Sequence, residues 1–324
     1  MTIFMNKIIS VAPMMDWTDR HCRYFHRLLA PSVTLYTEMV TANALIHGDA
    51  DRHLRFHDSE HPVVLQLGGS DPQAMAQAVE IAAPYPYDEI NINCGCPSDR
   101  VKSGAFGACL MNEPETVRDC ITAMQAVTDT PITVKCRIGI DDADEEVMLR
   151  TFISTVEQSG CNTIVVHARK AWLNGLSPKE NRDIPPLNYD LVKTIKQEYP
   201  HLDIQLNGGI TTIEQMVDLI PHYDGLMIGR AAYHTPCLLI DIERQFYNPN
   251  WAIDDETIIQ SMIDYANDQY EQYGTPIKTV TKHMINLFQG VKGARKWRQT
   301  ISENAHQAER AEDVLRPAFE YLES

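Results

Sequence analysis

The sequence lacks any apolar run that approaches the roughly 20 residues needed to cross a bilayer. Its opening stretch, MTIFMNKIIS, also lacks the long apolar region and the small-residue cleavage site of a secretory signal. Both absences argue against a membrane-spanning or exported protein. We therefore expect the chain to work in the cytoplasm.

The sequence also has few basic residues in comparison with acidic ones. The chain of 324 residues has 28 Lys and Arg against 44 Asp and Glu, which gives a net charge of −16. This balance argues against a protein that binds nucleic acid over its whole surface, because phosphates require clustered positive charge. Any contact with a nucleic acid would have to be local.

The 8 cysteines lack the regular spacing of a disulfide framework, and a chain of this length can build a large core without such bonds. We expect them to be reduced thiols. Cys94 and Cys96 form a C-x-C pair, but no second pair stands at the spacing of a zinc site. The sequence thus predicts no bound metal, although a redox or metal-binding C-x-C module stays an alternative to an enzyme.

Short β-branched apolar runs recur along the first part of the chain and predict eight strands. These runs are Ile8–Ala12, Val33–Thr37, Val63–Leu67, Glu89–Asn93, Ile132–Cys136, Thr163–His167, Asp203–Asn207 and Gly225–Gly229. Amphipathic stretches between them predict helices, among them Pro72–Ala83, Pro114–Val127 and Glu145–Ser159. The alternation predicts an α/β fold, a (β/α)8 TIM barrel. A doubly wound sheet is the alternative, but VAPMMDWTDR has no GxGxxG after the first strand.

Strand signals vanish from Asp254 onward, and three helices are predicted instead. They cover Glu256–Tyr270, Pro276–Gly290 and Glu309–Leu322. We therefore predict a barrel domain over residues 1–244 and a small helical domain over residues 245–324.

Polar and ionisable residues follow most of the predicted strands. In a parallel barrel, catalytic groups lie at the carboxyl ends of the strands and in the loops after them. The residues at these ends are Pro13, Met14, Met15, Glu38, Met39, Gln66, Asn93, Cys96, Lys135, Arg137, His167, Arg169, Asn207, Gly208, Gly209, Gly229 and Arg230. One such residue is expected by chance, but so many ends with polar groups favour a shared ligand.

Glycines end the seventh and eighth strands, in LNGGI and MIGRA. Loops at these two positions of a barrel often bind phosphate through backbone N–H groups, and Arg230 would add a charged clamp. The alternative is that both glycines serve turns with a left-handed backbone. The sequence alone leaves both interpretations open.

A series of motifs gives the chain a family resemblance. PMMDWTDR, VLQLGG, NINCGCPS with DRVKSGAFGACLM, TVKCRIGID, VVHAR, NGGI and IGRA occur in this order. The series resembles the tRNA-dihydrouridine synthases, which are FMN-dependent enzymes that reduce uridines of tRNA. NRDIPPLNYD and GVKGARKWRQ resemble the A-type subfamily in particular. The one departure is Cys94, where an aliphatic residue is common.

The resemblance implies a chemical role for Cys96. Reduction of the C5=C6 bond of uracil needs a hydride at C6, which N5 of reduced FMN would supply, and a proton at C5. A free thiol has a pKa of ~8.5 and is largely protonated at neutral pH, so Cys96 would be the acid. The alternative is that Cys96 is a small buried apolar residue, which is the usual role of a free cysteine. NADPH would reduce the flavin again.

The resemblance also implies neighbours for the cofactor. Pro13, Met14 and Met15 would line the isoalloxazine ring, and Gln66 would hydrogen-bond to its polar edge. Lys135 would lie near N1 and O2, where a cation stabilises the reduced ring. His167 would contact the flavin or its phosphate. The phosphate itself would be held by Asn207, Gly208, Gly209, Gly229 and Arg230.

Two basic regions stand out against the acidic whole. The stretch from Gln272 to Ser302 has no acidic residue and carries six basic residues beside Trp297. These are Lys278, Lys282, Lys292, Arg295, Lys296 and Arg298. The second region follows the sixth strand and has Arg169, Lys170, Lys179 and Arg182. A solvated basic helix is the plainer interpretation of such a run.

The resemblance implies that Lys179, Arg182, Arg295 and Arg298 contact tRNA, with Asn93 on the target uracil. A uridine must leave its stack to reach a barrel rim, so base flipping is expected. The A-type subfamily implies uridines of the D-loop, U20 and U20a, with the tRNA elbow as the docking region. A flavin enzyme that acts on a free pyrimidine, as dihydroorotate and dihydropyrimidine dehydrogenases do, is the alternative.

Overall fold

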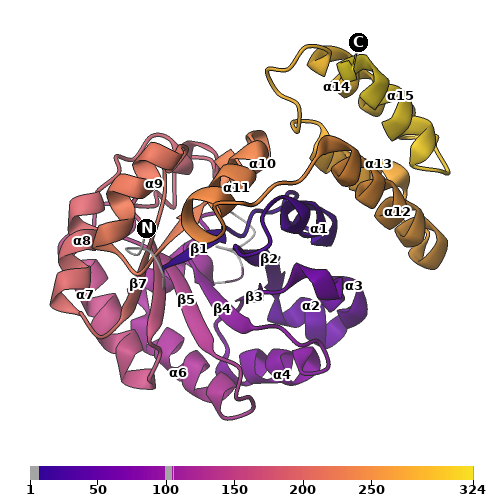
Figure 1. Ribbon diagram of the computed structural model, residues 1–324. Coiled ribbons are helices and arrows are strands. Elements are labelled where there is room, and N and C mark those ends of the chain that lie inside the picture. The colour runs from indigo at the N-terminus through magenta and orange to yellow at the C-terminus, as the bar shows by residue number, and fades with distance from the viewer. Residues whose placement is uncertain (1–6, 99–103, 105, 324) are drawn as a thin grey trace. The chain divides into compact units, whose positions relative to one another are not determined.

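The computed structural model describes residues 7–98, 104 and 106–323. Eight parallel strands form a closed barrel in which each pairs with the next and the last pairs with the first (Figure 1). They are β1 (Ile8–Val11), β2 (Thr34–Thr41), β3 (Val63–Gly68), β4 (Glu89–Cys94), β5 (Ile132–Arg137), β6 (Thr163–His167), β7 (Asp203–Asn207) and β8 (Gly225–Ile228). The predicted (β/α)8 barrel is confirmed, and so are its eight strands.

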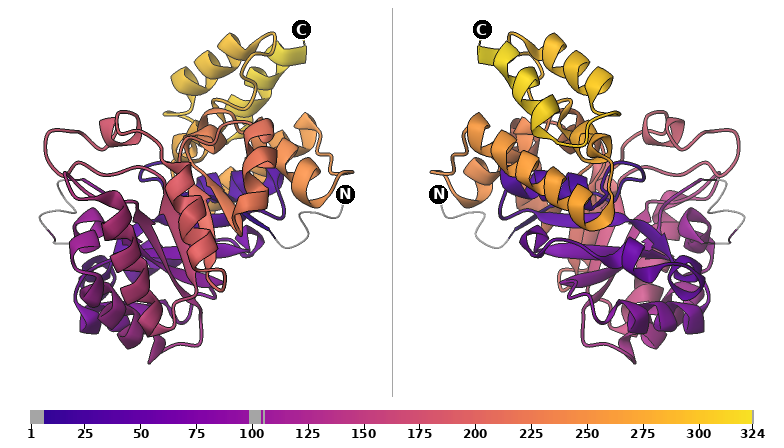
Figure 2. Two further views of the ribbon diagram at one scale, coloured as in Figure 1. Left: turned by 90° about the vertical axis from the view of Figure 1, so that its left-hand side faces the viewer. Right: turned by 90° about the vertical axis from the view of Figure 1, so that its right-hand side faces the viewer.

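Helices cover the outside of the barrel (Figure 1 and Figure 2). They are α2 (Ala42–His47), α3 (Ala50–Leu54), α4 (Pro72–Ala82), α6 (Pro114–Gln125), α7 (Glu145–Val156), α8 (Tyr189–Glu198) and α9 (Ile213–Leu219). Local signals explain where they begin. Asp71 caps α4 by accepting from the Ala74 N–H at 2.7 Å, and Asp144 caps α7 through the Glu146 N–H at 2.9 Å. The three helices predicted between the strands are confirmed.

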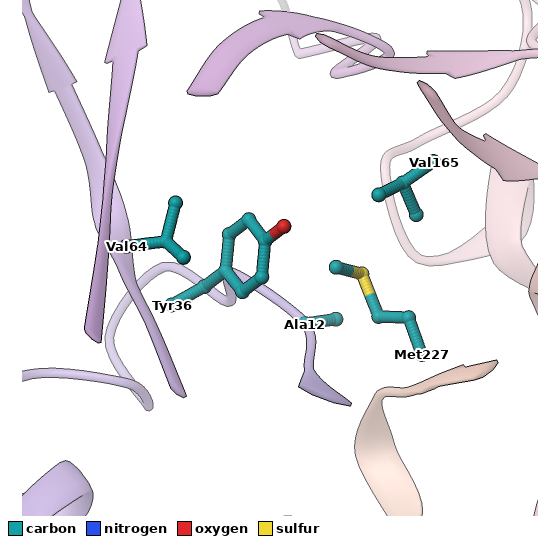
Figure 3. Close-up of a cluster of buried hydrophobic side chains, with 5 residues drawn as sticks. All are labelled: Ala12, Tyr36, Val64, Val165 and Met227. Atoms are coloured by element: carbon teal, nitrogen blue, oxygen red, sulfur yellow. The ribbon is translucent and has the colours of Figure 1, made fainter. Parts of the chain in front are cut away.

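The inside of the barrel is more polar than is usual for this fold. An apolar cluster of Ala12, Tyr36, Val64, Val165 and Met227 points into the space that the strands enclose (Figure 3). Alternate residues of a strand face the same side, so Gln66 shares the inward side with Val64. The buried polar residues at inward positions are Ser10, Gln66, Asn91, Asn93, Thr133, Gln205 and Asn207. Bulky aliphatic side chains dominate most such barrels.

A second compact unit consists of Asp16–Val33 together with the chain from Arg230 onward. Its helices are α1 (Arg20–Leu29), α10 (Arg230–His234), α11 (Cys237–Ile242), α12 (Asp255–Tyr273), α13 (Ile277–Thr281), α14 (Ala294–Asn304) and α15 (Glu312–Glu323). The α1 helix joins this unit because it packs against α11 and α12. Glu243 also accepts hydrogen bonds from the backbone N–H and hydroxyl of Ser32, at 2.9 and 2.7 Å. The functional division at 244/245 stays a prediction.

Two of the three helices predicted near the carboxyl end are confirmed, as α12 and α15. The helix predicted over Pro276–Gly290 is wrong in its second half. The α13 helix ends at Thr281, a 3-10 turn covers Lys282–Met284, and turns follow. Gly290 and Gly293 have φ values of 86° and 87°, which a continuous right-handed helix does not allow. A separate helix, α14, then begins at Ala294.

Three further observations apply to the described residues. No helix among them combines the length and the apolar composition that crossing a bilayer requires. All eight cysteines lie within the described part, and no disulfide joins them. No group of three or more His, Cys, Asp or Glu side chains in that part is arranged to hold a metal ion.

Candidate functional site

The loop after β4 carries Cys96 and is shaped by one side chain. The Oδ1 atom of Asn93 accepts the backbone N–H groups of Gly95 and Cys96, at 3.1 and 2.9 Å. The Ala108 N–H donates to the Cys96 carbonyl at 2.9 Å. Cys96 is half-buried, and its Sγ lies 3.5 Å from the Ser98 hydroxyl. Part of the motif after it, residues 99–103 and 105, lies outside the described residues.

The other thiols of β4 and β5 lie in a different environment. Cys94 and Cys136 are opposite each other in the strand register and are fully buried. Burial raises the pKa of Cys136 to about 12 and the pKa of Cys94 well above its usual value. Neither thiol is accessible, so among the three only Cys96 can meet a ligand.

Amides of neighbouring strands meet beside this loop. The Asn93 Nδ2 group donates to the Gln66 Oε1 atom at 2.8 Å, and Gln66 Nε2 donates to Asn91 Oδ1 at 2.9 Å. Gln66 and Asn91 are fully buried, and Asn93 is 8% exposed. The structure therefore brings together two predicted site residues, Gln66 and Asn93, with Asn93 nearer to solvent.

Lys135 supplies a positive charge on the adjacent strand. It is opposite Asn93 in the register of β4 and β5, and its Nζ donates to Asn207 Oδ1 at 3.1 Å. Asn207 in turn donates from Nδ2 to the Met227 carbonyl at 2.7 Å. Burial lowers the pKa of Lys135 to about 8, and the charge of Arg137 acts in the same direction. An anion placed beside this ammonium group would favour its charged form.

His167 lies beside the glycine turn that follows β7. Gly208 and Gly209 have φ values of 116° and 69°, so the left-handed turn interpretation holds for both. A Cβ on Gly208 would come within 2.7 Å of the His167 ring, which shows how closely the ring packs against the turn. Burial lowers the pKa of His167 well below its usual value, with Arg137 and Lys135 acting in the same direction. The imidazole is therefore neutral.

Gly229 differs from the glycines after β7. Its φ lies outside the left-handed range, and among the described residues a Cβ built on it would approach only Ala12, at 3.9 Å. Neither the backbone nor protein packing requires glycine there. The open space beside its backbone would allow a ligand to approach closely.

The segment after β1 presents apolar side chains to solvent. Pro13 and Met14 are half-buried, and Met15 is 50% exposed. Methionine is flexible and polarisable, so it suits contact with a flat apolar ligand. The geometry is compatible with the predicted role of these residues.

Arg137 is a residue whose role the sequence did not predict. Its guanidinium group donates to the carbonyls of Gly95, Lys170 and Asn181, at 2.8, 2.9 and 3.0 Å. It is 3% exposed, and burial lowers its pKa to about 10. One buried cation thus ties the Cys96 loop to the long loop after β6. Only the structure identifies these carbonyls, because nothing in the sequence marks them.

The long loop after β6 carries two of the predicted tRNA contacts, Lys179 and Arg182, and both are exposed. Asn181 between them is fully buried. Its amide accepts from the Trp172 N–H at 2.7 Å and donates to the Trp172 carbonyl at 2.9 Å. The alternation of a buried amide with exposed cations presents the two charges to solvent.

The remaining predicted residues belong to the second unit. Arg230 begins α10, and Arg295 and Arg298 lie in α14. Arg295 and Arg298 line a hollow of about 810 Å³ together with His234 and Gly290. Trp297 is fully buried, donates to the Met284 carbonyl at 3.1 Å and packs edge-on against Phe288. The basic helix is therefore anchored by its tryptophan, which is not available to stack on a base.

The closed parallel barrel carries a half-buried thiol, a half-buried ammonium group, an imidazole and an amide pair at its strand ends, which is where TIM-barrel enzymes carry their catalytic groups. Comparison with known proteins identifies its family. The family model described as dihydrouridine synthase (Dus) matches residues 10–322. The chain therefore belongs to the dihydrouridine synthase family, whose members are flavin-dependent, tRNA-modifying oxidoreductases.

Curated relatives match along nearly the whole chain. One from Xanthomonas campestris pv. campestris is 55% identical over 299 residues, covering 92% of this chain and 88% of the relative. One from Vibrio cholerae is 51% identical over 313 residues, covering 96% and 95%. One from Escherichia coli K12 is 51% identical over 315 residues, covering 97% and 91%. Each of the three is named tRNA-dihydrouridine(20/20a) synthase.

Proposed function

We propose that this chain reduces the D-loop uridines U20 and U20a of tRNA to dihydrouridine in the cytoplasm, with FMN as its flavin and NADPH as the reductant. The names of its relatives support the substrate. The observation that carries the proposal is the arrangement on β4 and β5. A half-buried thiol at Cys96, an amide hydrogen on Asn93 that has no partner among the described residues, and the cation of Lys135 lie at the ends of two neighbouring strands.

The residues at the strand ends fit FMN. Exposed Met15 with Pro13 and Met14 would contact the ring, and Gln66 would bind its polar edge. Lys135 would stabilise negative charge at N1 and O2, while His167 would contact the ring or the phosphate. The phosphate would be held by Asn207, Gly208, Gly209, Gly229 and Arg230. Gly229 supports this role, because the open space beside it would let a phosphate approach the backbone. When bound, the flavin supplies the hydride.

The protein groups would complete the reduction. Cys96 donates its thiol proton to C5 of the uracil as the C5=C6 bond is reduced, and the resulting thiolate is reprotonated from solvent. Asn93 hydrogen-bonds to the base and also holds the loop of Cys96 in place. A flipped uridine would reach these groups, because a stacked base cannot enter a barrel rim.

The acidic surface leaves tRNA only a few places to bind. Lys179 and Arg182 on the loop after β6, and Arg295 and Arg298 on α14, are the proposed contacts. All four stand on elements that internal hydrogen bonds or a buried tryptophan hold firmly. The acidic remainder would repel RNA elsewhere and favour one orientation.

The double change Arg295→Ala with Arg298→Ala tests the α14 contacts. We expect weaker tRNA binding, and the slope of log affinity against log salt should decrease by about two, because two phosphates would no longer be neutralised by an arginine. NADPH oxidation should not change. The measurement is tRNA binding at several salt concentrations.

A matched control is Arg310→Ala with Arg316→Ala, which removes the same charge from the second unit. These arginines pair with Glu271, Glu312 and Glu256 instead of lining the hollow. They should leave the salt dependence unchanged. If the Arg295 and Arg298 variant binds tRNA like wild type, α14 is merely a solvated basic helix.

The function as a whole is tested by mass spectrometry of tRNA from a strain that lacks this chain. Uridines at the two D-loop positions should fail to gain two hydrogens, and the purified protein with NADPH should restore them. Dihydrouridine at normal levels in that tRNA would refute the proposal. Reduction of free uracil but not of tRNA would favour the free-pyrimidine alternative.

A further inference from the structure

A chain of hydrogen bonds runs through the barrel interior from the Cys96 loop to a carboxylate. It passes from Asn93 to Gln66 and Asn91, and then from Asn91 Nδ2 to the Thr133 hydroxyl at 2.8 Å. Thr133 donates to Glu89 Oε1, which also accepts from the Tyr36 hydroxyl at 3.2 Å. The interior members Gln66, Asn91 and Thr133 are 0%, 0% and 3% exposed.

The donor–acceptor direction of this hydrogen-bond network is determined at the end nearest the Cys96 loop. The two backbone N–H groups of Gly95 and Cys96 can only donate, so the Asn93 atom that faces them must be oxygen. Its nitrogen then faces Gln66, which must present oxygen in return, and Gln66 presents its own nitrogen to Asn91. Each amide thus fixes the orientation of the next one.

The other end of the network, at Glu89, imposes the same donor–acceptor direction. The Oε1 atom of Glu89 accepts from the Tyr36 hydroxyl and also receives the hydroxyl hydrogen of Thr133, while burial raises the pKa of the Glu89 carboxyl group to about 7. Thr133 then offers only its lone pairs to Asn91, which must donate from Nδ2 and keep Oδ1 for Gln66. Asn91 is the residue where the constraints from the two ends meet.

The direction leaves Asn93 with a defined capacity for further bonds. Among the described residues its oxygen already accepts two hydrogens, while Nδ2 donates only one of its two. It can therefore donate to a ligand but has no acceptor left. A pyrimidine carbonyl oxygen suits this donor, whereas an amino group at the same place would set donor against donor.

We propose that Asn91 is a positioning residue for the reaction. This inference rests on the proposed function. Asn91 holds the amides of Gln66 and Asn93 in one direction, so that Asn93 offers the base an N–H donor and keeps the Cys96 loop in place. With Asn91 removed, Gln66 loses the acceptor that holds its Nε2 group, so its side chain can turn and withdraw Oε1 from Asn93 Nδ2. Asn93 then keeps its bonds to the Gly95 and Cys96 N–H groups but loses the bond that positions its nitrogen.

The test compares Asn91→Leu with Gln205→Leu. Both remove a buried amide from the barrel interior, but Gln205 does not belong to this hydrogen-bond network. Among the described residues it donates only to Asp203, at 3.2 Å. We expect Asn91→Leu to lower the single-turnover rate of dihydrouridine formation on the order of 100-fold, because a small misplacement of reacting groups has effects of that size. Its affinity for tRNA should not change. Gln205→Leu should keep the wild-type rate.

A second measurement does not depend on activity. The rate at which iodoacetamide alkylates Cys96, followed by peptide mass spectrometry, reports the position of the Cys96 loop. We expect Asn91→Leu to change this rate and Gln205→Leu to leave it unchanged. Asn91→Asp should recover most of both properties, because burial keeps its carboxyl group protonated, so that the hydroxyl donates to Thr133 while the other oxygen still accepts from Gln66.

Thr133→Val provides an independent variant should Asn91→Leu fail to fold. It removes the hydroxyl oxygen that accepts a hydrogen bond from Asn91 Nδ2, so the same changes are expected in weaker form. Wild-type rate and alkylation in a folded Asn91→Leu or Thr133→Val variant would overturn the inference, as would equal losses in Gln205→Leu. Absence of dihydrouridine from the wild-type reaction would instead overturn the proposed function, and the alkylation comparison would still test the positioning role.

Discussion

Cys96→Ala is expected to slow dihydrouridine formation by about 10²- to 10⁴-fold, the usual contribution of a general acid. The alanine lacks the proton that C5 of the uracil requires. Within the described residues the thiol makes one hydrogen bond, at 3.5 Å to Ser98, so its loss should not disturb the loop. Flavin content and tRNA affinity should match wild type. The measurement is a single-turnover rate with nucleoside mass spectrometry.

Cys94→Ala is the matched control, because it removes a thiol two positions earlier on the same segment. Cys94 is fully buried on the side of β4 that faces away from the barrel interior. Its removal should reduce stability slightly and leave the reaction rate unchanged. An unchanged rate in Cys96→Ala would refute the acid assignment, and an equal loss in Cys94→Ala would point to general disruption of the strand.

Arg137→Met is expected to destabilise the protein by about 2–3 kcal/mol, because buried carbonyls that lose their donors keep the cost of desolvation. Three carbonyls depend on this guanidinium group, those of Gly95, Lys170 and Asn181. Methionine fills much of the same volume without a donor. The measurement is the free energy of unfolding in urea.

Arg150→Met serves as the control for loss of an arginine. Arg150 makes exposed ion pairs with Glu146 and Glu198 on the outside of the barrel. Such pairs contribute little to stability, so a much smaller change is expected. Equal unfolding free energies for the two variants would show that the Arg137 contacts do not hold the loops. A slower reaction is also expected from Arg137→Met, because the Gly95 carbonyl beside Cys96 is released.

The strands were more predictable than the helices of the second unit. A buried parallel strand is a short β-branched run, and this signal is local, as Asp203–Asn207 illustrates with the same bounds in the sequence and in the structure. The chain over Pro276–Gly290 has helical composition throughout. It stops being helical after Met284 because glycines with positive φ and the packing of Trp297 determine the path.

The sequence by itself determined the barrel, the candidate residues at its strand ends and the family. These follow from order along the chain: alternating strands and helices place every strand's carboxyl end at one rim, and motifs such as NINCGCPS are read directly. Tertiary structure decided the rest. The three carbonyls that Arg137 holds, and the path from Asn93 through Asn91 to Glu89, join strands and loops far apart in sequence. Hydrogen-bond direction is a property of atoms in contact, and only the closed barrel brings those atoms together.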